Sequence, residues 1–132
     1  MDVILIDDDI DTTEIFSEYL TIKGFNVVGV GHNGKEAAQL YQKLKPDVVV
    51  LDIMMPHFDG FFGIHEIRKL KKNAKIVIAT ADVSVETAKK LEDLSPYAIL
   101  HKPYDLDSLE DLLREIKNIE ETKHFEKDLI ER

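Results

Sequence analysis

Aspartates follow two of the most apolar runs in the chain, and they are the residues that best indicate chemistry. The run VVVL at 48–51 leads directly into Asp52, and the run VILI at 3–6 leads into the aspartates at 7–9. A short, continuous apolar run is typical of a strand buried on both faces of a parallel sheet. Both sets of aspartates are therefore expected at the carboxyl ends of strands, the edge where open α/β sheets build their sites.

If these two strands are parallel neighbours, Asp7 and Asp8 face Asp52 across the edge of the sheet. Two carboxylates about 4 Å apart repel each other by roughly 4 kcal/mol at an effective dielectric constant near 20, so three together need a positive partner. A hard divalent cation with oxygen ligands meets that need, and Mg²⁺ is the usual one where phosphate is also handled. The three aspartates therefore predict a magnesium site.

Two further reactive side chains follow predicted strands. Thr80 follows the run at 74–79, and Lys102 follows the run at 97–100. A hydroxyl and an ammonium beside three carboxylates favour phosphoryl transfer, in which catalysis is mostly positioning and neutralisation of charge. Asp52 is then the nucleophile that becomes an aspartyl phosphate. Lys102 neutralises phosphoryl oxygens, and Thr80 donates a hydrogen bond to one of them and so reports the phosphate to the surface.

Strand and helix patterns alternate five times along the chain, and this alternation predicts the fold. It predicts an α/β protein with a doubly wound, five-stranded parallel sheet in the flavodoxin-like order 2-1-3-4-5 and helices on both faces. The expected strands are 2–6, 25–30, 48–52, 74–79 and 97–100. The expected helices are 10–23, 35–44, 61–70, 83–94 and 105–119.

The end of the chain is expected to extend the last helix. Residues 1–119 form the predicted domain, and residues 120–132 form a charged C-terminal tail. Asp107 and Glu110 have the spacing of a capping box at the start of that helix. The apolar residues of the tail are Phe125, Leu129 and Ile130. These apolar residues could form the interface of a homodimer.

The composition excludes several classes of protein. The chain has 132 residues, which matches one domain, and a net charge of −9, which argues against direct binding of nucleic acid. It has no cysteine, which excludes a disulfide framework and a thiolate metal site. The N-terminus enters a strand without a signal peptide, and no apolar run approaches the roughly 20 residues of a membrane span. We therefore expect a cytoplasmic protein without a membrane partner.

Five separated motifs resemble those of the receiver domains of two-component response regulators. They are residues 4–9 (ILIDDD), residues 51–56 (LDIMMP), Asp59-Gly60, Thr80-Ala81 and Lys102-Pro103. The resemblance covers residues 2–118 and is to the single-domain type found among chemotaxis and sporulation regulators. Because the motifs fall in order at separate strand ends, the match is specific.

The resemblance implies a function and assigns roles to residues. It implies that Asp52 receives a phosphoryl group from a sensor histidine kinase. It implies that Asp8, Asp52 and the backbone carbonyl of Met54 bind Mg²⁺, and that Asp7 helps mainly through water. A receiver is a signalling phosphoacceptor that catalyses only its own phosphorylation and dephosphorylation. It acts on a downstream protein partner, which we expect at residues 84–118.

The chain departs from the family pattern just before Lys102. The residue three before Lys102 is usually aromatic or histidine in this family, and here it is Ile99. Tyr97 is the nearest aromatic residue, and it points to the same face as Ile99 only if the strand is regular there. The resemblance also implies a cis peptide bond between Lys102 and Pro103.

Two other functions remain open from the sequence. A small phosphohydrolase also has an aspartate nucleophile after its first strand and a second aspartate two residues on, as Asp7 and Asp9 are here. However, Asp11 stands where such enzymes have a hydrophobic or hydroxyl residue, and their cap insertion and later acidic pair are missing. The other is an unphosphorylated pseudo-receiver that serves as a dimer scaffold, against which the intact set of site residues argues. Turnover distinguishes a phosphohydrolase from a receiver, because a receiver is labelled once whereas an enzyme releases phosphate repeatedly.

Overall fold

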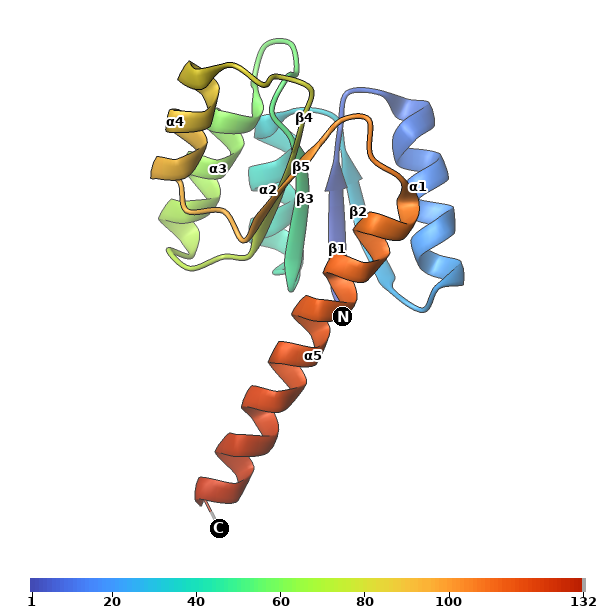
Figure 1. Ribbon diagram of the computed structural model, residues 1–132, viewed down its shortest axis with the longest axis vertical. Coiled ribbons are helices and arrows are strands. Elements are labelled where there is room, and N and C mark those ends of the chain that lie inside the picture. Colours follow the sequence, from blue (N-terminus) through green and yellow to red (C-terminus); the bar gives the residue numbers. More distant parts are fainter. Residues whose placement is uncertain (132) are drawn as a thin grey trace.

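Five parallel strands form one sheet in the order β2-β1-β3-β4-β5, which confirms the predicted topology (Figure 1). The computed structural model describes residues 1–131, and their side chains except at residue 124 and residues 127–131. All four pairs of neighbouring strands are parallel. The strands are β1 (Asp2–Ile6), β2 (Asn26–Gly31), β3 (Val48–Asp52), β4 (Ile76–Thr80) and β5 (Ala98–His101).

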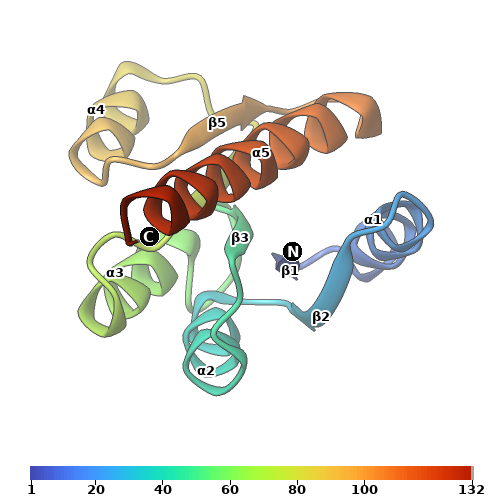
Figure 2. The ribbon, with the colours of Figure 1, turned by 90° about the horizontal axis from the view of Figure 1, so that it is seen from below.

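Five helices connect the strands and cover both faces of the sheet. They are α1 (Ile10–Ile22), α2 (Gly34–Leu44), α3 (Gly60–Leu70), α4 (Val85–Asp93) and α5 (Leu106–Glu131). Seen from below, α1 and α5 lie on one face, and α2, α3 and α4 lie on the other (Figure 2). This is the doubly wound, flavodoxin-like arrangement that the alternation of patterns predicted.

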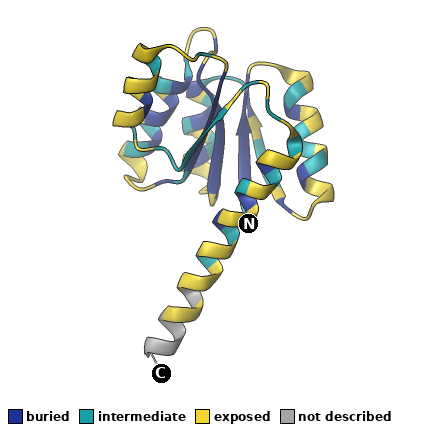
Figure 3. Ribbon diagram, viewed as in Figure 1, coloured by how far each residue is buried: buried dark blue, intermediate teal, exposed yellow. Residues whose placement is uncertain are grey.

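Each face of the sheet has its own hydrophobic core. Because alternate residues of a strand point to opposite faces, β1 sends Ile4 and Ile6 to the core under α2, α3 and α4. It sends Val3 and Leu5 to the core under α1 and α5. All residues of β3 and β4 are buried, so these strands lie at the centre of the molecule (Figure 3). Their last residues are Asp52 and Thr80, two residues of the predicted site.

Three strands begin slightly later in the chain than the sequence indicated. β2 begins at Asn26, β4 at Ile76 and β5 at Ala98. The predicted start of β4 at residue 74 is two residues too early. Ala74 is apolar and buried, like a strand residue, but it belongs to the turn before the strand. In that turn the Ala74 amide donates to the Lys71 carbonyl. At its other end β4 includes Thr80, one residue beyond the predicted strand.

The last helix has a different cap from the predicted one. Oδ1 of Asp105 accepts a hydrogen bond from the Ser108 amide at 2.7 Å, so Asp105 caps α5. The predicted capping box is wrong, because the carboxylates of Asp107 and Glu110 instead accept hydrogen bonds from the Tyr19 hydroxyl, at 2.7 and 3.0 Å. These two bonds fasten the start of α5 to α1.

The second half of α5 projects beyond the sheet (Figure 1). Ile116 is buried against the domain, whereas Phe125 is 64% exposed. Lys75, just before β4, forms an ion pair with Glu120 at the point where the helix leaves the domain. The side chains of Leu129 and Ile130, and the whole of Arg132, lie outside the described residues. Among the described residues, no helix is both long enough and apolar enough to cross a membrane.

Candidate functional site

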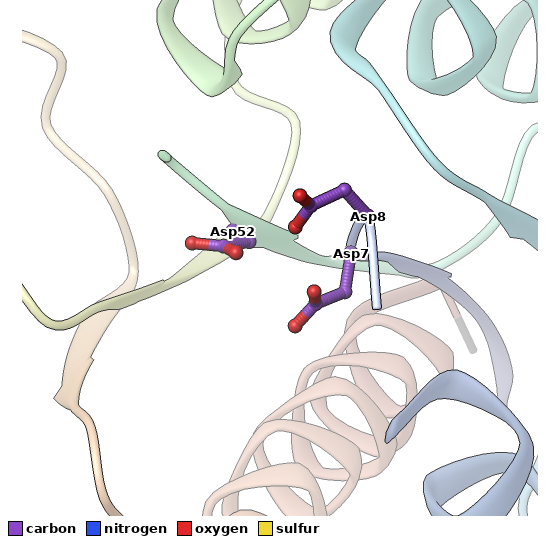
Figure 4. A group of neighbouring side chains, drawn as sticks. All are labelled: Asp7, Asp8 and Asp52. Carbon is purple, nitrogen blue, oxygen red and sulfur yellow. The ribbon is translucent and has the colours of Figure 1, made fainter. Parts of the chain in front are cut away.

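The three aspartates singled out in the sequence meet at the carboxyl edge of the sheet (Figure 4). Asp7 and Asp8 follow β1, Asp52 ends β3, and these two strands pair directly. One oxygen from each carboxylate lies within 4.8 Å of the other two, so the group could hold a single cation. Asp7 and Asp52 are buried and Asp8 is exposed, so the group opens to solvent on the side of Asp8. Carboxylate oxygens are the ligands that Mg²⁺ prefers.

Lys102 reaches into this group from the end of β5. Its Nζ donates to Oδ2 of Asp7 at 3.0 Å and to Oδ2 of Asp52 at 3.2 Å. The peptide bond between Lys102 and Pro103 is cis, as the family resemblance implied. One ammonium beside three carboxylates leaves an excess of negative charge, which a divalent cation would balance.

Burial and neighbouring charges shift the pKa values of Asp52 and Lys102. Burial raises the pKa of Asp52, and the charge of Asp7 adds to the rise, although the Lys102 ammonium acts in the opposite direction. Burial works to lower the pKa of Lys102, but its bonds to the two carboxylates outweigh burial, and the pKa of Lys102 is raised. At neutral pH the lysine therefore stays charged, and it is the positive partner of Asp52, which burial alone would favour as the neutral acid.

Main-chain hydrogen bonds hold the loop that follows Asp52. The Met54 amide donates to Oδ1 of Asp52 at 3.1 Å, and the Gly60 amide donates to the Ile53 carbonyl at 3.0 Å. A Cβ at Gly60 would collide with the Asp52 carbonyl, so this close approach requires a glycine. The backbone of Met54 therefore lies beside the Asp52 carboxylate, while the Met54 side chain is 60% exposed.

Behind this loop, α2 and α3 approach each other closely at their first turns. The Gly34 amide donates to the Phe58 carbonyl at 2.6 Å. A Cβ at Gly34 would collide with the Asp59 carbonyl and press on the Gly63 amide. The two helices can pack this tightly because position 34 is glycine.

Thr80 lies between the strand of Asp52 and the strand that leads into Lys102, and it is fully buried. Its carbonyl accepts a hydrogen bond from the Lys102 amide at 2.8 Å. Its side-chain oxygen Oγ1 accepts one from the Asp82 amide at 3.0 Å. The main chain of Thr80 is thus fixed by the sheet, and rotation about χ1 is the freedom that its hydroxyl retains.

Tyr97 and Ile99 pack into different cores. Ile99 packs against the core under α2, α3 and α4, whereas Tyr97 packs against the core under α1 and α5. Tyr97 lies before the first residue of β5, and its hydroxyl donates to Oε1 of Glu115 at 3.1 Å. The alternation of the strand does not extend back to Tyr97, so this tyrosine does not supply the aromatic side chain that Ile99 replaces.

Sequence reasoning missed Tyr104, which lies at the same edge of the sheet. Burial raises the pKa of Tyr104 to about 12. Its ring packs edge-on against Phe16, with 5.8 Å between the ring centroids. Tyr104, Phe16 and Lys102 line part of a cavity of about 440 Å³ that opens beside the site. Its position two residues after the lysine was the signal available in the sequence.

Comparison with known proteins agrees with this geometry. A family model described as the response regulator receiver domain matches residues 3–114. The chemotaxis protein CheY of Thermotoga maritima is 39% identical over 79 residues, which cover 60% of this chain and 66% of that protein. The regulatory protein AtoC of Escherichia coli is 31% identical over 107 residues, which cover 81% of this chain and 23% of that protein. The chain therefore spans just under two thirds of one relative and less than a quarter of the other.

Solved structures of similar proteins share the fold. The CheX-CheY-BeF3-Mg+2 complex from Borrelia burgdorferi contains a chain with a TM-score of 0.80 and 25% identity, and the match covers 88% of each chain. The Francisella response regulator 1452 receiver domain has a TM-score of 0.78 and 28% identity, covering 89% of this chain and 98% of that one. On the match to residues 3–114 and the shared sheet order, the chain belongs to the response regulator receiver domain family of two-component systems.

Proposed function

We propose that Asp52 accepts a phosphoryl group from the phosphohistidine of a sensor histidine kinase. A carboxylate oxygen of Asp52 attacks phosphorus, the bond between phosphorus and the histidine nitrogen breaks, and the nitrogen keeps the electron pair. The observation that carries this proposal is the placement of Lys102 Nζ at 3.0 and 3.2 Å from Asp7 and Asp52, inside a group of three carboxylates. The nucleophile, a positively charged side chain and the metal ligands would therefore lie next to one another.

Asp7, Asp8, Asp52 and the backbone carbonyl of Met54 would hold Mg²⁺. The donor set fits this ion, because the grouped ligand atoms are carboxylate oxygens whose charge Lys102 balances only in part. When bound, the ion neutralises charge on the oxygens of the transferring phosphoryl group. The chain's own contribution is orientation: the Met54 amide holds Oδ1 of Asp52, and Lys102 bonds Oδ2.

Thr80 would relay the phosphoryl group to the surface. Its hydroxyl would turn towards a phosphoryl oxygen and donate a hydrogen bond to it, which is worth about 1.5–3 kcal/mol for a charged acceptor. The resulting shift would change the face formed by residues 84–118, which we assign to a downstream protein partner. The net charge of −9 disfavours direct contact with nucleic acid or an anionic membrane surface.

The protein would act in the cytoplasm as a signalling phosphoacceptor, catalysing only its own phosphorylation and dephosphorylation. Residues 1–119 would be the receiver domain and residues 120–132 a tail that continues the last helix. The exposed side chain of Phe125 supports a homodimer formed through this tail.

Intact mass after incubation with Mg²⁺ and acetyl phosphate tests the acceptor. Wild type should gain one phosphoryl group, and EDTA should prevent the gain. Asp52→Asn should gain none, whereas the control Asp59→Asn should be labelled like wild type, because Asp59 lies in the same connection but caps α3 through the Phe62 amide. Labelling of Asp52→Asn, or release of phosphate in many turnovers, would overturn the proposal.

A further inference from the structure

A network of hydrogen bonds joins Thr80 to the start of α4. The Asp82 amide donates to Oγ1 of Thr80 at 3.0 Å. The carboxylate of Asp82 accepts from the Ser84 amide at 2.8 Å and from the Thr87 hydroxyl at 2.6 Å, each on a different oxygen. Ser84 caps α4, since its Oγ accepts from the Thr87 amide at 3.2 Å. Asp82 is therefore the link between the buried end of β4 and the first turn of α4.

Apolar packing does little to hold this segment in place. Val83 is 79% exposed and Val85 is 72% exposed. Along α4, which the structure describes in full, Leu91 alone is buried. Segments with few buried apolar contacts open easily and depend on hydrogen bonds for their order. The bonds made by Asp82 therefore determine where the segment between β4 and α4 lies.

The bond between Thr80 and Asp82 competes with the proposed relay. The main chain of Thr80 is fixed by its bond to the Lys102 amide, so rotation about χ1 is the motion by which its hydroxyl would turn towards a phosphoryl oxygen. That rotation carries Oγ1 away from the Asp82 amide, and an amide left without an acceptor is unfavourable. The Asp82 backbone must then shift to a new acceptor, and its two carboxylate bonds to α4 resist the shift.

We propose that Asp82 and Thr87 form a latch that positions Thr80 and opposes the phosphorylated conformation; this inference rests on the function proposed above. The two are positioning residues, since both act through Thr80 rather than on the phosphoryl group. The Thr87 hydroxyl and the Ser84 amide hold the pKa of Asp82 below its usual value, so the carboxylate that closes the latch is ionised at neutral pH.

Binding of fluoroberyllate in the presence of Mg²⁺ tests the latch, because this anion stands in for the phosphoryl group. Thr87→Val removes the hydroxyl that bonds Asp82, and Thr87→Ser keeps it as the matched control. We expect Thr87→Val to bind fluoroberyllate about three- to tenfold more tightly than wild type, which is the effect of losing one hydrogen bond that holds the unbound conformation. Thr87→Ser should bind like wild type.

A second measurement reports the latch without any ligand. Hydrogen exchange at the Asp82 amide, followed by NMR, should be faster in Thr87→Val than in Thr87→Ser, because the amide is held against Thr80 only while the latch is closed. Asp82→Ala removes the other half of the latch and should also strengthen fluoroberyllate binding. It supplies the same comparison if Thr87→Val does not fold.

The outcomes separate this inference from the proposed function. If wild type binds fluoroberyllate and Thr87→Val binds it equally or more weakly, the latch is wrong and the phosphoacceptor proposal stands. If wild type does not bind fluoroberyllate with Mg²⁺, the phosphoacceptor proposal fails, and the latch falls with it. Tighter binding by Thr87→Val but not by Thr87→Ser supports both.

Discussion

The Nζ of Lys102 lies 3.2 Å from Oδ2 of Asp52, although β4 separates their strands in the sheet. The lysine side chain therefore reaches across the strand that carries Thr80. A change of charge on Asp52 acts directly on the end of β5, as well as on the loop that follows the aspartate. This contact links the two sides of the site before any ligand is present.

Replacement of the lysine should destabilise the metal-free protein. Lys102→Met removes the ammonium that lies between Asp7 and Asp52 and leaves two buried carboxylates facing each other. We expect the free energy of unfolding to fall by about 2 kcal/mol in EDTA, less than for a fully buried pair because the lysine is partly exposed. Urea unfolding measures this, with Lys89→Met on the exposed side of α4 as the control. Equal stability of the two variants would contradict the prediction.

Magnesium should stabilise the fold through the three aspartates. At an ion concentration ten times the dissociation constant, binding to the folded state alone adds about 1.4 kcal/mol. Asp8→Asn should lose this gain, because Asp8 is one of the three carboxylates whose oxygens lie together. Thermal unfolding with increasing Mg²⁺ measures the effect. Asp11→Asn, an exposed aspartate in the first turn of α1, should respond to Mg²⁺ like wild type.

Asp52→Asn should make the metal-free protein more stable at pH 7. Burial raises the pKa of Asp52, so the folded state binds the proton more tightly than the unfolded chain does. Stability is therefore lost as the pH rises from the ordinary value of 3.8 through the raised pKa of the folded protein, and the loss is complete above it. Asparagine has no charge to bury, and we expect a gain of about 1 kcal/mol at pH 7.

Urea unfolding of both proteins in EDTA across this pH range checks the sign. The gain from Asp52→Asn should shrink as the pH falls and should vanish below 3.8, where the carboxyl of wild type becomes protonated in both states. A difference that stays constant with pH would show that ionisation of Asp52 is not its cause.

The strand ends were predictable from sequence, because burial of a central strand is a local property of its residues. The apolar runs located Asp52 and Thr80 at one edge without any knowledge of the tertiary structure. The direction of Tyr97 was not predictable, because it depends on where β5 begins, and hydrogen bonding with β4 sets that point. The Tyr97 amide donates to the Ile76 carbonyl before the ladder of β5 starts.

The cap of α5 shows the same limit. Asp105 and Asp107 both fit the pattern of an N-terminal cap, and local sequence does not distinguish them. In the structure the Asp107 carboxylate accepts a hydrogen bond from the hydroxyl of Tyr19 in α1, 88 positions away in the chain, and Asp105 is the residue that caps the helix.

Arg68 gives a second example of contacts that local sequence does not predict. Its guanidinium donates hydrogen bonds to the carbonyls of Leu94 and Ser95. Contacts between residues so distant in the chain leave no periodic signal in it.

Loss of the observed cap should weaken α5. Asp105→Ala removes the acceptor for the Ser108 amide and should cost about 1 kcal/mol of stability. Asp105→Asn keeps a side-chain oxygen in the same place and should cost only a few tenths of a kcal/mol, roughly the difference between two good caps. Urea unfolding of the two variants side by side gives the comparison. A larger cost for asparagine than for alanine would argue against this cap.

The phosphorylated form should dimerise through the projecting part of α5. Phe125 is 64% exposed there, and pairing two such helices would remove it from water. Sedimentation of wild type with Mg²⁺ and fluoroberyllate should show twice the monomer mass, and Phe125→Asp should remain monomeric. Ile22→Asp is the control, since Ile22 is 82% exposed at the end of α1. If wild type stays monomeric under these conditions, the predicted dimer is wrong.

The two sides of the domain differ in how closely their backbones pack. At Gly34 the backbones of α2 and the loop before α3 are in contact, so neither can move towards the other without steric collision. On the other side of Asp52, α4 rests on one buried leucine and a few hydrogen bonds. We therefore expect added charge at Asp52 to displace α4 rather than α2 or α3. The close backbone contact at Gly34 thus leaves α4 as the side of the domain with room to move.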